Sequence, residues 1–148
     1  MDHVKSIALD ANILIRAALG KRVSQLFEMY RPHVDFYTPD VCLIEAKKHV
    51  PAILAKHSRS KAEEALNTLD SLEREGIVQL MPFASYGILE KEAKQRIASR
   101  DPDDWSLVAV SLVLNCPIWT EDKDFFGTGV AVWNTANVEI YLKMQAEQ

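Results

Sequence analysis

Acidic residues stand at three places in the sequence where an apolar segment ends or a helix begins, and a fourth acid lies within an expected helix. Asp10 follows the apolar run 4–9, and Asp122 follows a second, shorter apolar run. Glu45 lies in an expected helix, and Asp104 precedes a long apolar stretch. Four carboxylates within a few ångströms of each other repel strongly, and a hard divalent cation with oxygen ligands offsets that repulsion. The residue types therefore indicate a Mg²⁺ or Mn²⁺ site.

Each acid also has a simpler structural explanation. Aspartate is favoured at helix N-termini, so Asp10, Asp104 and Asp122 could each cap a helix. A helical glutamate such as Glu45 is more often solvated than a ligand. Capping does not explain why acids should follow strand ends and converge with a helical glutamate, so the joint pattern favours a metal site.

Hydrolysis of a phosphodiester is the chemistry that fits such a site. Divalent ions activate water and stabilise the charge that develops on the leaving oxygen, and carboxylates can accept a proton. No set of cysteines and histidines has the spacing of a zinc site. The histidines are scattered and are expected to be ordinary surface or core residues: His3, His33, His49 and His57.

Short apolar strands that alternate with helices must position these acids. Strands are expected at 4–9, 34–38, 77–81, 117–120 and 130–132. Helices are expected at 13–19, 23–30, 39–50, 59–75, 88–98, 107–114 and 134–144, with a helical turn at 122–126. This alternation predicts a single domain, residues 1–148, folded as a three-layer α/β/α sandwich around a mostly parallel sheet. Ligands of such sheets bind beyond the carboxyl ends of the strands, where Asp10 and Asp122 fall.

Local signals set several details of this prediction. Pro51 is expected to kink or end its helix near Val50. Glu90 is placed to pair with Lys94 one helical turn later. The cysteines have no metal-type spacing and are expected to be buried: Cys42 and Cys116.

Composition excludes several classes of protein. Hydrophobic residues make up 48% of the 148 residues, too many for a disordered chain. No apolar run approaches the roughly 20 residues of a membrane span, and a signal-peptide core is absent, so a cytoplasmic location is expected. Lys and Arg number 17 against 21 Asp and Glu, a net charge of -4. That charge does not suit a general nucleic-acid coating protein, but it leaves room for a nuclease with a locally basic surface.

At these residues the sequence resembles the PIN-domain nucleases, which include the VapC toxins of toxin–antitoxin pairs. The first family motif is similar to IALDANILIRAALG, and the second resembles TPDVCLIEAKKHV. The third motif is the strongest match and reads DPDDWSLVAVSLVLNCPIWTEDKDF. The motifs occur in family order and span residues 4–126.

The resemblance implies an endoribonuclease that depends on Mg²⁺ or Mn²⁺ and hydrolyses RNA phosphodiesters. It assigns catalysis and metal binding to Asp10, Glu45, Asp104 and Asp122. It adds Asp124 as a further metal ligand, Asn12 and Thr120 as supporting residues, and Asp101 as the alternative third acid. Glu121 is expected to be exposed rather than catalytic. A toxin of this kind would bind an antitoxin, and PIN domains often pair as homodimers.

The basic stretch 47–61 follows the helix that carries Glu45 and contains no acid. Its cations are candidates for contacts with RNA phosphates: Lys47, Lys48, Lys56, Arg59 and Lys61. An ordinary solvated face is the alternative explanation for any one of them.

Two other functions fit parts of the pattern. The main alternative is a PIN-fold scaffold that binds RNA or protein without cutting, and the intact acid set argues against it. A phosphoacceptor of receiver or haloacid-dehalogenase type also has an Asp after the first strand. A dehalogenase-like enzyme would need a second Asp at position 12, where this chain has Asn12.

Overall fold

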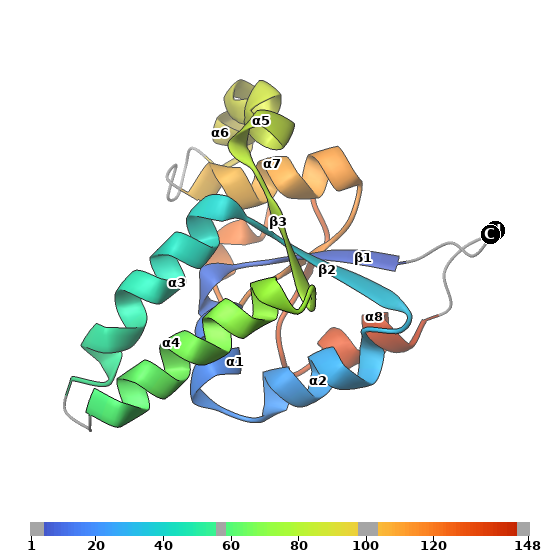
Figure 1. Ribbon diagram of the computed structural model, residues 1–148. Helices are drawn as coiled ribbons and strands as arrows, with labels where there is room; N and C mark the ends of the chain where they lie inside the picture. Colours follow the sequence, from blue (N-terminus) through green and yellow to red (C-terminus); the bar gives the residue numbers. More distant parts are fainter. Residues whose placement is uncertain (1–4, 56–58, 98–103, 145–148) are drawn as a thin grey trace.

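A five-stranded sheet forms the centre of the molecule (Figure 1). The structure is a computed structural model that describes residues 5–55, 59–97 and 104–144. The strands are β1 (Lys5–Leu9), β2 (Val34–Pro39), β3 (Val78–Met81), β4 (Ile118–Trp119) and β5 (Val132–Trp133). They lie in the order β3-β2-β1-β4-β5, and every adjacent pair is parallel. The predicted parallel α/β architecture is confirmed.

Helices cover both faces of the sheet (Figure 1). One face carries α1 (Ala11–Leu19), α2 (Arg22–Tyr30), α3 (Asp40–Ile53), α4 (Arg59–Arg74) and α8 (Val138–Lys143). The other carries α5 (Phe83–Tyr86), the 3₁₀ turn η1 (Gly87–Leu89), α6 (Glu90–Ile97) and α7 (Trp105–Leu114). A further 3₁₀ turn, η3 (Lys123–Phe125), follows β4.

The central strand β1 shows why the sequence contains short apolar runs. Ile7 and Leu9 point into the core beneath α1 to α4, and Ala8 points into the core beneath α7. All three are fully buried. Successive side chains of a strand face opposite sides, so a strand covered on both faces is apolar throughout. In β1 the half-buried residues at the start, Lys5 and Ser6, are polar, whereas the fully buried part is apolar and ends at Asp10, where the strand leaves the sheet.

The helix that carries Glu45 does not end at Val50, so the predicted end is wrong, while the alternative that Pro51 kinks the helix stays a prediction. It continues through Pro51 to Ile53. Proline lacks an N–H and costs a helix one hydrogen bond. The helix nevertheless continues past Pro51, and the Leu54 N–H donates to the Val50 carbonyl at 3.1 Å.

Two other boundaries differ from prediction. The C-terminal helix begins at Val138 rather than at 134. Asn134 accepts the Asn137 N–H through its side chain at 2.9 Å, a local turn that competes with a helix. The unpredicted α5 is held at its start by Asp40, whose Oδ2 accepts the Phe83 N–H at 3.2 Å.

Other local predictions are confirmed. Glu90 and Lys94 form an ion pair at 3.0 Å. Cys42 and Cys116 are buried. Among the described helices, none combines the length and the apolar character that a membrane span requires. The cytoplasmic location stays a prediction.

Candidate functional site

Asp10 lies at the carboxyl end of β1 and is 8% exposed. Its backbone N–H donates to the Trp119 carbonyl at 3.1 Å, which ties it to the end of β4. Its Oδ1 accepts the Ala11 N–H at 2.7 Å, so the carboxylate also caps α1. The capping explanation is therefore correct for Asp10, and it leaves the carboxylate at the sheet edge where a ligand is expected.

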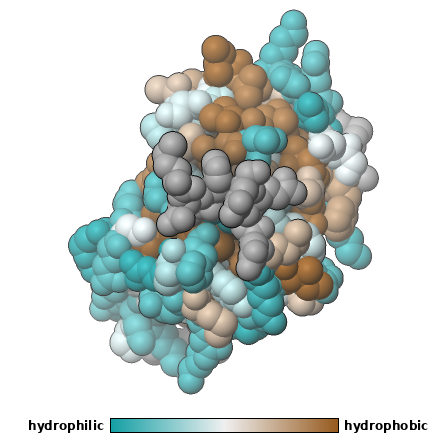
Figure 2. All heavy atoms as spheres, turned by 90° about the vertical axis from the view of Figure 1, so that its right-hand side faces the viewer, coloured by the Kyte–Doolittle hydropathy of each residue, from teal (hydrophilic) through white to brown (hydrophobic). Residues whose placement is uncertain are grey.

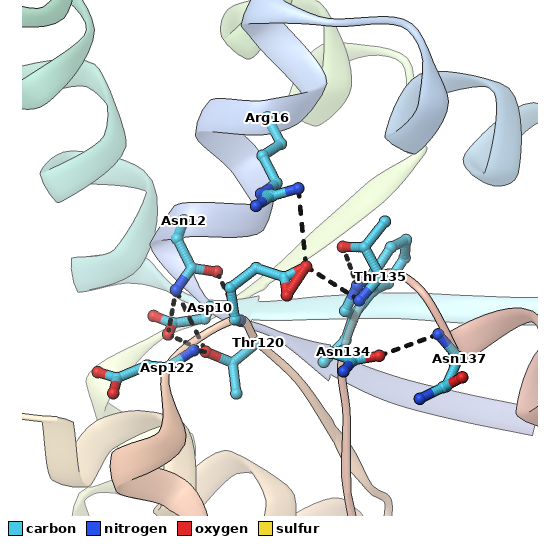
Figure 3. Close-up of polar contacts among 10 residues, drawn as sticks. Asp10, Asn12, Arg16, Thr120, Asp122, Asn134, Thr135 and Asn137 are labelled. Atoms are coloured by element: carbon cyan, nitrogen blue, oxygen red, sulfur yellow. Dashed lines mark hydrogen bonds and ion pairs between the residues drawn. The ribbon is translucent and has the colours of Figure 1, made fainter.

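Asn12 and Thr120 hold the second oxygen of this carboxylate (Figure 3). Asp10 Oδ2 accepts the Thr120 hydroxyl at 2.5 Å and Asn12 Nδ2 at 3.1 Å. Asn12 Nδ2 lies 3.2 Å from Thr120 Oγ1, and the Asp122 N–H donates to that oxygen at 3.0 Å. The single Thr120 proton goes to Asp10, so the hydroxyl oxygen accepts both N–H groups. These contacts bring four of the predicted residues together.

Charge links two further acids to Asp10. Burial raises the pKa of Asp10, while its hydrogen bonds to Thr120 and Ala11 lower it. The negative charges of Asp122 and Glu45 raise this pKa further. Asp10, Asp122 and Glu45 are therefore close enough for their negative charges to interact.

Glu45 and Asp122 differ in how firmly they are held. Glu45 projects from α3 with its side chain 51% exposed, and its Oε1 lies 3.6 Å from His49 Nε2. Asp122 is half-buried, and its Oδ1 accepts the Asp124 N–H at 2.9 Å to cap η3. Asp122 is thus held by the turn after β4, whereas the Glu45 carboxylate is half-exposed and lies beside His49 of its own helix.

Asp104 immediately precedes α7 and is half-buried. Figure 1 shows α7 starting on the side of the sheet where β1 ends. Asp101 lies outside the described residues. The choice of Asp104 over Asp101 as the third acid stays a prediction.

The expected four-acid cluster is not present as a ready-made metal site. Within residues 5–55, 59–97 and 104–144, no three His, Cys, Asp or Glu side chains form a group that could hold a metal ion. In kind, the donors nevertheless fit a hard cation. Asp10, Asp122 and Glu45 offer only oxygen ligands, which hard cations prefer. The charges of Asp122 and Glu45 raise the pKa of Asp10, and a divalent cation would offset the repulsion among the three carboxylates.

Glu121 is half-buried, so the expectation that it is exposed is wrong. Its Oε1 accepts the Thr135 N–H at 3.0 Å and lies 3.7 Å from Arg16 Nη1. Its backbone N–H donates to Asn12 Oδ1 at 3.3 Å. The sequence contains one signal of this arrangement, because Arg16 lies one helical turn after Asn12 and shares its face of α1.

Two cations of the basic stretch 47–61 form ion pairs with acidic residues. Lys47 Nζ lies 2.7 Å from Asp70 Oδ1, and Arg59 Nε lies 3.7 Å from Glu63 Oε1. Lys48 is exposed, and no ion pair joins it to another residue that the structure describes. Lys61 is exposed as well, and Lys56 lies outside the described residues.

Solved structures share this architecture. VapBC2 of Rickettsia felis, bound to a promoter DNA fragment, is similar with a TM-score of 0.61 and 18% identity, over 87% of this chain and 98% of that one. FitAcB of Neisseria gonorrhoeae gives 0.61 and 20%, over 88% and 98%. PAE2754 of Pyrobaculum aerophilum gives 0.67 and 14%, over 94% and 89%. At these identities the likeness establishes the fold alone.

The sequence comparisons address the family directly. A search of curated proteins gave no significant match. A family model described as the PIN domain matches residues 8–143, which include every acid discussed above. PIN domains are generally nucleases, and the resemblance noted in the sequence is confirmed at the level of family and fold. This chain belongs to the PIN-domain family.

Proposed function

We propose that this protein is a divalent-metal-dependent endoribonuclease whose reacting centre lies at Asp10. The observation that supports this most directly is the state of the Asp10 carboxylate. It is 8% exposed, held by Asn12 and Thr120, and subject to the charges of Asp122 and Glu45. A buried acid on which the charges of two nearby acids act suits a cation site, because a bound divalent cation would offset their repulsion.

The residues have distinct roles in this proposal. The acids Asp10, Glu45, Asp104 and Asp122, with Asp124 as a further ligand, would hold Mg²⁺ or Mn²⁺. When bound, the cation activates water and stabilises charge on the phosphate. Asn12 and Thr120 keep the Asp10 carboxylate in one orientation, since both donate to its Oδ2. An ionised carboxylate at the site can receive the proton of the attacking water.

RNA would approach across the exposed cations that follow Glu45. Lys48 is the strongest candidate for a phosphate contact, because it is exposed and no described residue pairs with it. Lys61 and Arg59 are weaker candidates, and Arg59 forms an ion pair with Glu63. Lys47 is the weakest, since Asp70 lies 2.7 Å from its ammonium group.

Cleavage of a structured RNA tests the proposal. We expect cleavage with Mg²⁺ or Mn²⁺, no cleavage in EDTA, and a loss of more than about 100-fold in Asp10→Asn, larger than is usual for residues that only support ligands. Asp35→Asn is the matched control, because it makes the same change near the start of β2, at the opposite end of the sheet from Asp10. Cleavage that survives both EDTA and Asp10→Asn would refute the proposal.

A PIN-fold scaffold that binds RNA or protein without cutting is the second candidate. The observation that favours it is the lack of a group of three metal-binding side chains among the described residues. The same assay separates the two functions. RNA that binds but stays intact with every divalent cation, in the unmodified protein, would select the scaffold.

Partner proteins form the next part of the proposal. Structures with this fold include VapBC2 and FitAB, each solved bound to DNA, and the VapC resemblance points to an antitoxin for this chain. Exposed apolar residues are typical of a surface that binds a partner or a second copy of the chain. Ile88 is 87% exposed and Phe83 is 53% exposed. Figure 2 shows apolar side chains gathered in the upper part of one face. Co-purification with the product of a neighbouring reading frame, and light scattering of the purified chain, test the antitoxin and the homodimer.

A further inference from the structure

A second polar network lies beside Asp10, and the proposed reaction does not use it. Figure 3 labels its members Arg16 and Thr135, and Glu121 contacts both. The Glu121 side chain is 25% exposed. Oε1 accepts the Thr135 N–H at 3.0 Å and lies 3.7 Å from Arg16 Nη1. One carboxylate therefore joins the turn after β4 to helix α1 and to the segment after β5.

The backbone of Glu121 determines how the Asn12 amide is turned. The Glu121 N–H donates to Asn12 Oδ1 at 3.3 Å, while Asn12 Nδ2 donates to Asp10 Oδ2 at 3.1 Å. A flipped amide would set its NH₂ against the Glu121 N–H and its oxygen against the Asp10 carboxylate. Both contacts would be repulsive. The position of Glu121 thus fixes which group Asn12 presents to Asp10.

The same turn carries the other residues that surround Asp10. Thr120 precedes Glu121 and donates to Asp10, and Asp122 follows it and donates its N–H to Thr120. A shift of Glu121 would therefore move both neighbours. The anchor is itself held, because Trp119, which is fully buried, donates from Nε1 to Thr135 Oγ1 at 3.1 Å.

We infer that Glu121 is a positioning residue. Its carboxylate holds the 120–122 turn against Thr135 and Arg16, so that Asn12 and its neighbours keep their orientation around Asp10. The positioning is a property of the metal-free protein. Its consequence for metal binding rests on the proposed function.

Three substitutions separate the two contacts of the Glu121 carboxylate. Glu121→Gln keeps an oxygen for the Thr135 N–H and loses the charge that faces Arg16. Glu121→Ala loses both contacts. Arg16→Met loses only the ion pair, which is half-exposed, with the Arg16 side chain 55% exposed.

Two measurements read out the position of Asn12 and its effect. The first is the side-chain amide signal of Asn12 in ¹H–¹⁵N spectra of the metal-free protein. The second is the affinity for Mn²⁺ by titration calorimetry. We expect Glu121→Ala to shift the Asn12 signal and weaken Mn²⁺ binding by about 10-fold or more, as is usual for residues that orient ligands. Glu121→Gln should keep the Asn12 signal and the Mn²⁺ affinity close to those of the unmodified protein. Arg16→Met should change the Mn²⁺ affinity by less than about fivefold, because half-exposed ion pairs contribute little.

A purely structural role gives a different result. If Glu121→Ala lowers the melting temperature but leaves the Asn12 signal and the Mn²⁺ affinity unchanged, the inference is overturned. Should this variant fail to fold, the same two measurements are made on Glu121→Asp, whose shorter side chain withdraws the carboxylate from Thr135 and keeps the charge. An unchanged Asn12 signal and an unchanged Mn²⁺ affinity in Glu121→Asp would then overturn the inference. If the unmodified protein binds no Mn²⁺, the proposed function fails, and the Asn12 signal alone decides whether Glu121 positions the site.

Discussion

Replacing Thr120 by valine removes one hydroxyl and leaves the shape of the side chain nearly unchanged. Thr120 is 2% exposed. Its Oγ1 donates to Asp10 Oδ2 at 2.5 Å and accepts from Asn12 Nδ2 at 3.2 Å and from the Asp122 N–H at 3.0 Å. The substitution therefore removes three hydrogen bonds at the centre of the site.

The magnitude follows from the partners. A hydrogen bond to a charged group contributes about 1.5–3 kcal/mol, and a neutral one about 1 kcal/mol. Asn12 and Asp122 are half-buried, so water replaces part of what they lose. We expect the free energy of unfolding in EDTA to fall by about 2–4 kcal/mol at neutral pH. For a chain of this size, that lowers the melting temperature by roughly 4–16 °C.

Denaturant unfolding followed by tryptophan fluorescence measures the change, with Thr120→Ser as the matched control. Serine keeps the hydroxyl and loses one buried methyl group, which costs about 1 kcal/mol. Valine should therefore be the less stable of the two variants. If Thr120→Val is as stable as Thr120→Ser, or more stable, the hydroxyl does not hold Asp10 and the reasoning about the site fails.

The same variant has a defined dependence on pH. Burial raises the pKa of Asp10 in the folded protein, and the Thr120 bond opposes that rise. An acid with a raised folded-state pKa costs stability as pH rises from its unfolded to its folded pKa. Loss of the Thr120 bond raises the pKa further, so the deficit of Thr120→Val should be smaller in acid, where Asp10 is protonated, than at neutral pH. A deficit that does not change with pH would contradict this account.

Three further predictions concern other parts of the chain. Asp104→Asn should abolish metal-dependent RNA cleavage and leave the melting temperature unchanged or higher, because it removes a like charge; normal cleavage would mean that another acid completes the site. Lys48→Ala should weaken RNA binding and reduce its log–log salt dependence by about 1, measured by fluorescence anisotropy. Hydrogen bonds from Tyr30 and Arg22 lower the pKa of Glu139 in the folded protein. Ionised Glu139 therefore stabilises the fold at pH values above its unfolded-state pKa, and this stabilisation is lost in acid. Glu139→Gln should thus lower the melting temperature at neutral pH only, and an equal loss in acid would refute the assignment.

The strands and the position of Asp10 could be predicted because they follow from local pattern. Residues 7–9 are apolar because that part of β1 is covered on both faces, and Asp10 marks the point where that cover ends. Helix ends were less predictable, since they depend on competing contacts. Pro51 is tolerated in a last turn, and Asn134 forms a turn of its own where the apolar pattern alone favours helix.

The polar network could be predicted only in part. Asn12 and Thr120 are identified by family resemblance, but their contacts join residues more than 100 positions apart, which no local pattern encodes. Glu121 illustrates the limit. A glutamate in a polar turn is expected in solvent, and only the folded chain brings Arg16 and Thr135 to its carboxylate.

The strand order explains why the site forms between β1 and β4. The chain builds the sheet outward from β1 through β2 to β3, and then returns to add β4 and β5 on the other side of β1. The direction of building reverses between β1 and β4, and parallel sheets bind ligands at such a reversal, beyond the strand ends. Asp10 leaves β1 at this point, and Thr120 and Asp122 leave β4. Topology therefore accounts for the meeting of the strand-end residues, whereas Glu45 arrives from α3 on a half-exposed side chain. It follows that Glu45→Gln should affect cation affinity more than folding stability, while changes at Asp10 or Thr120 should affect both.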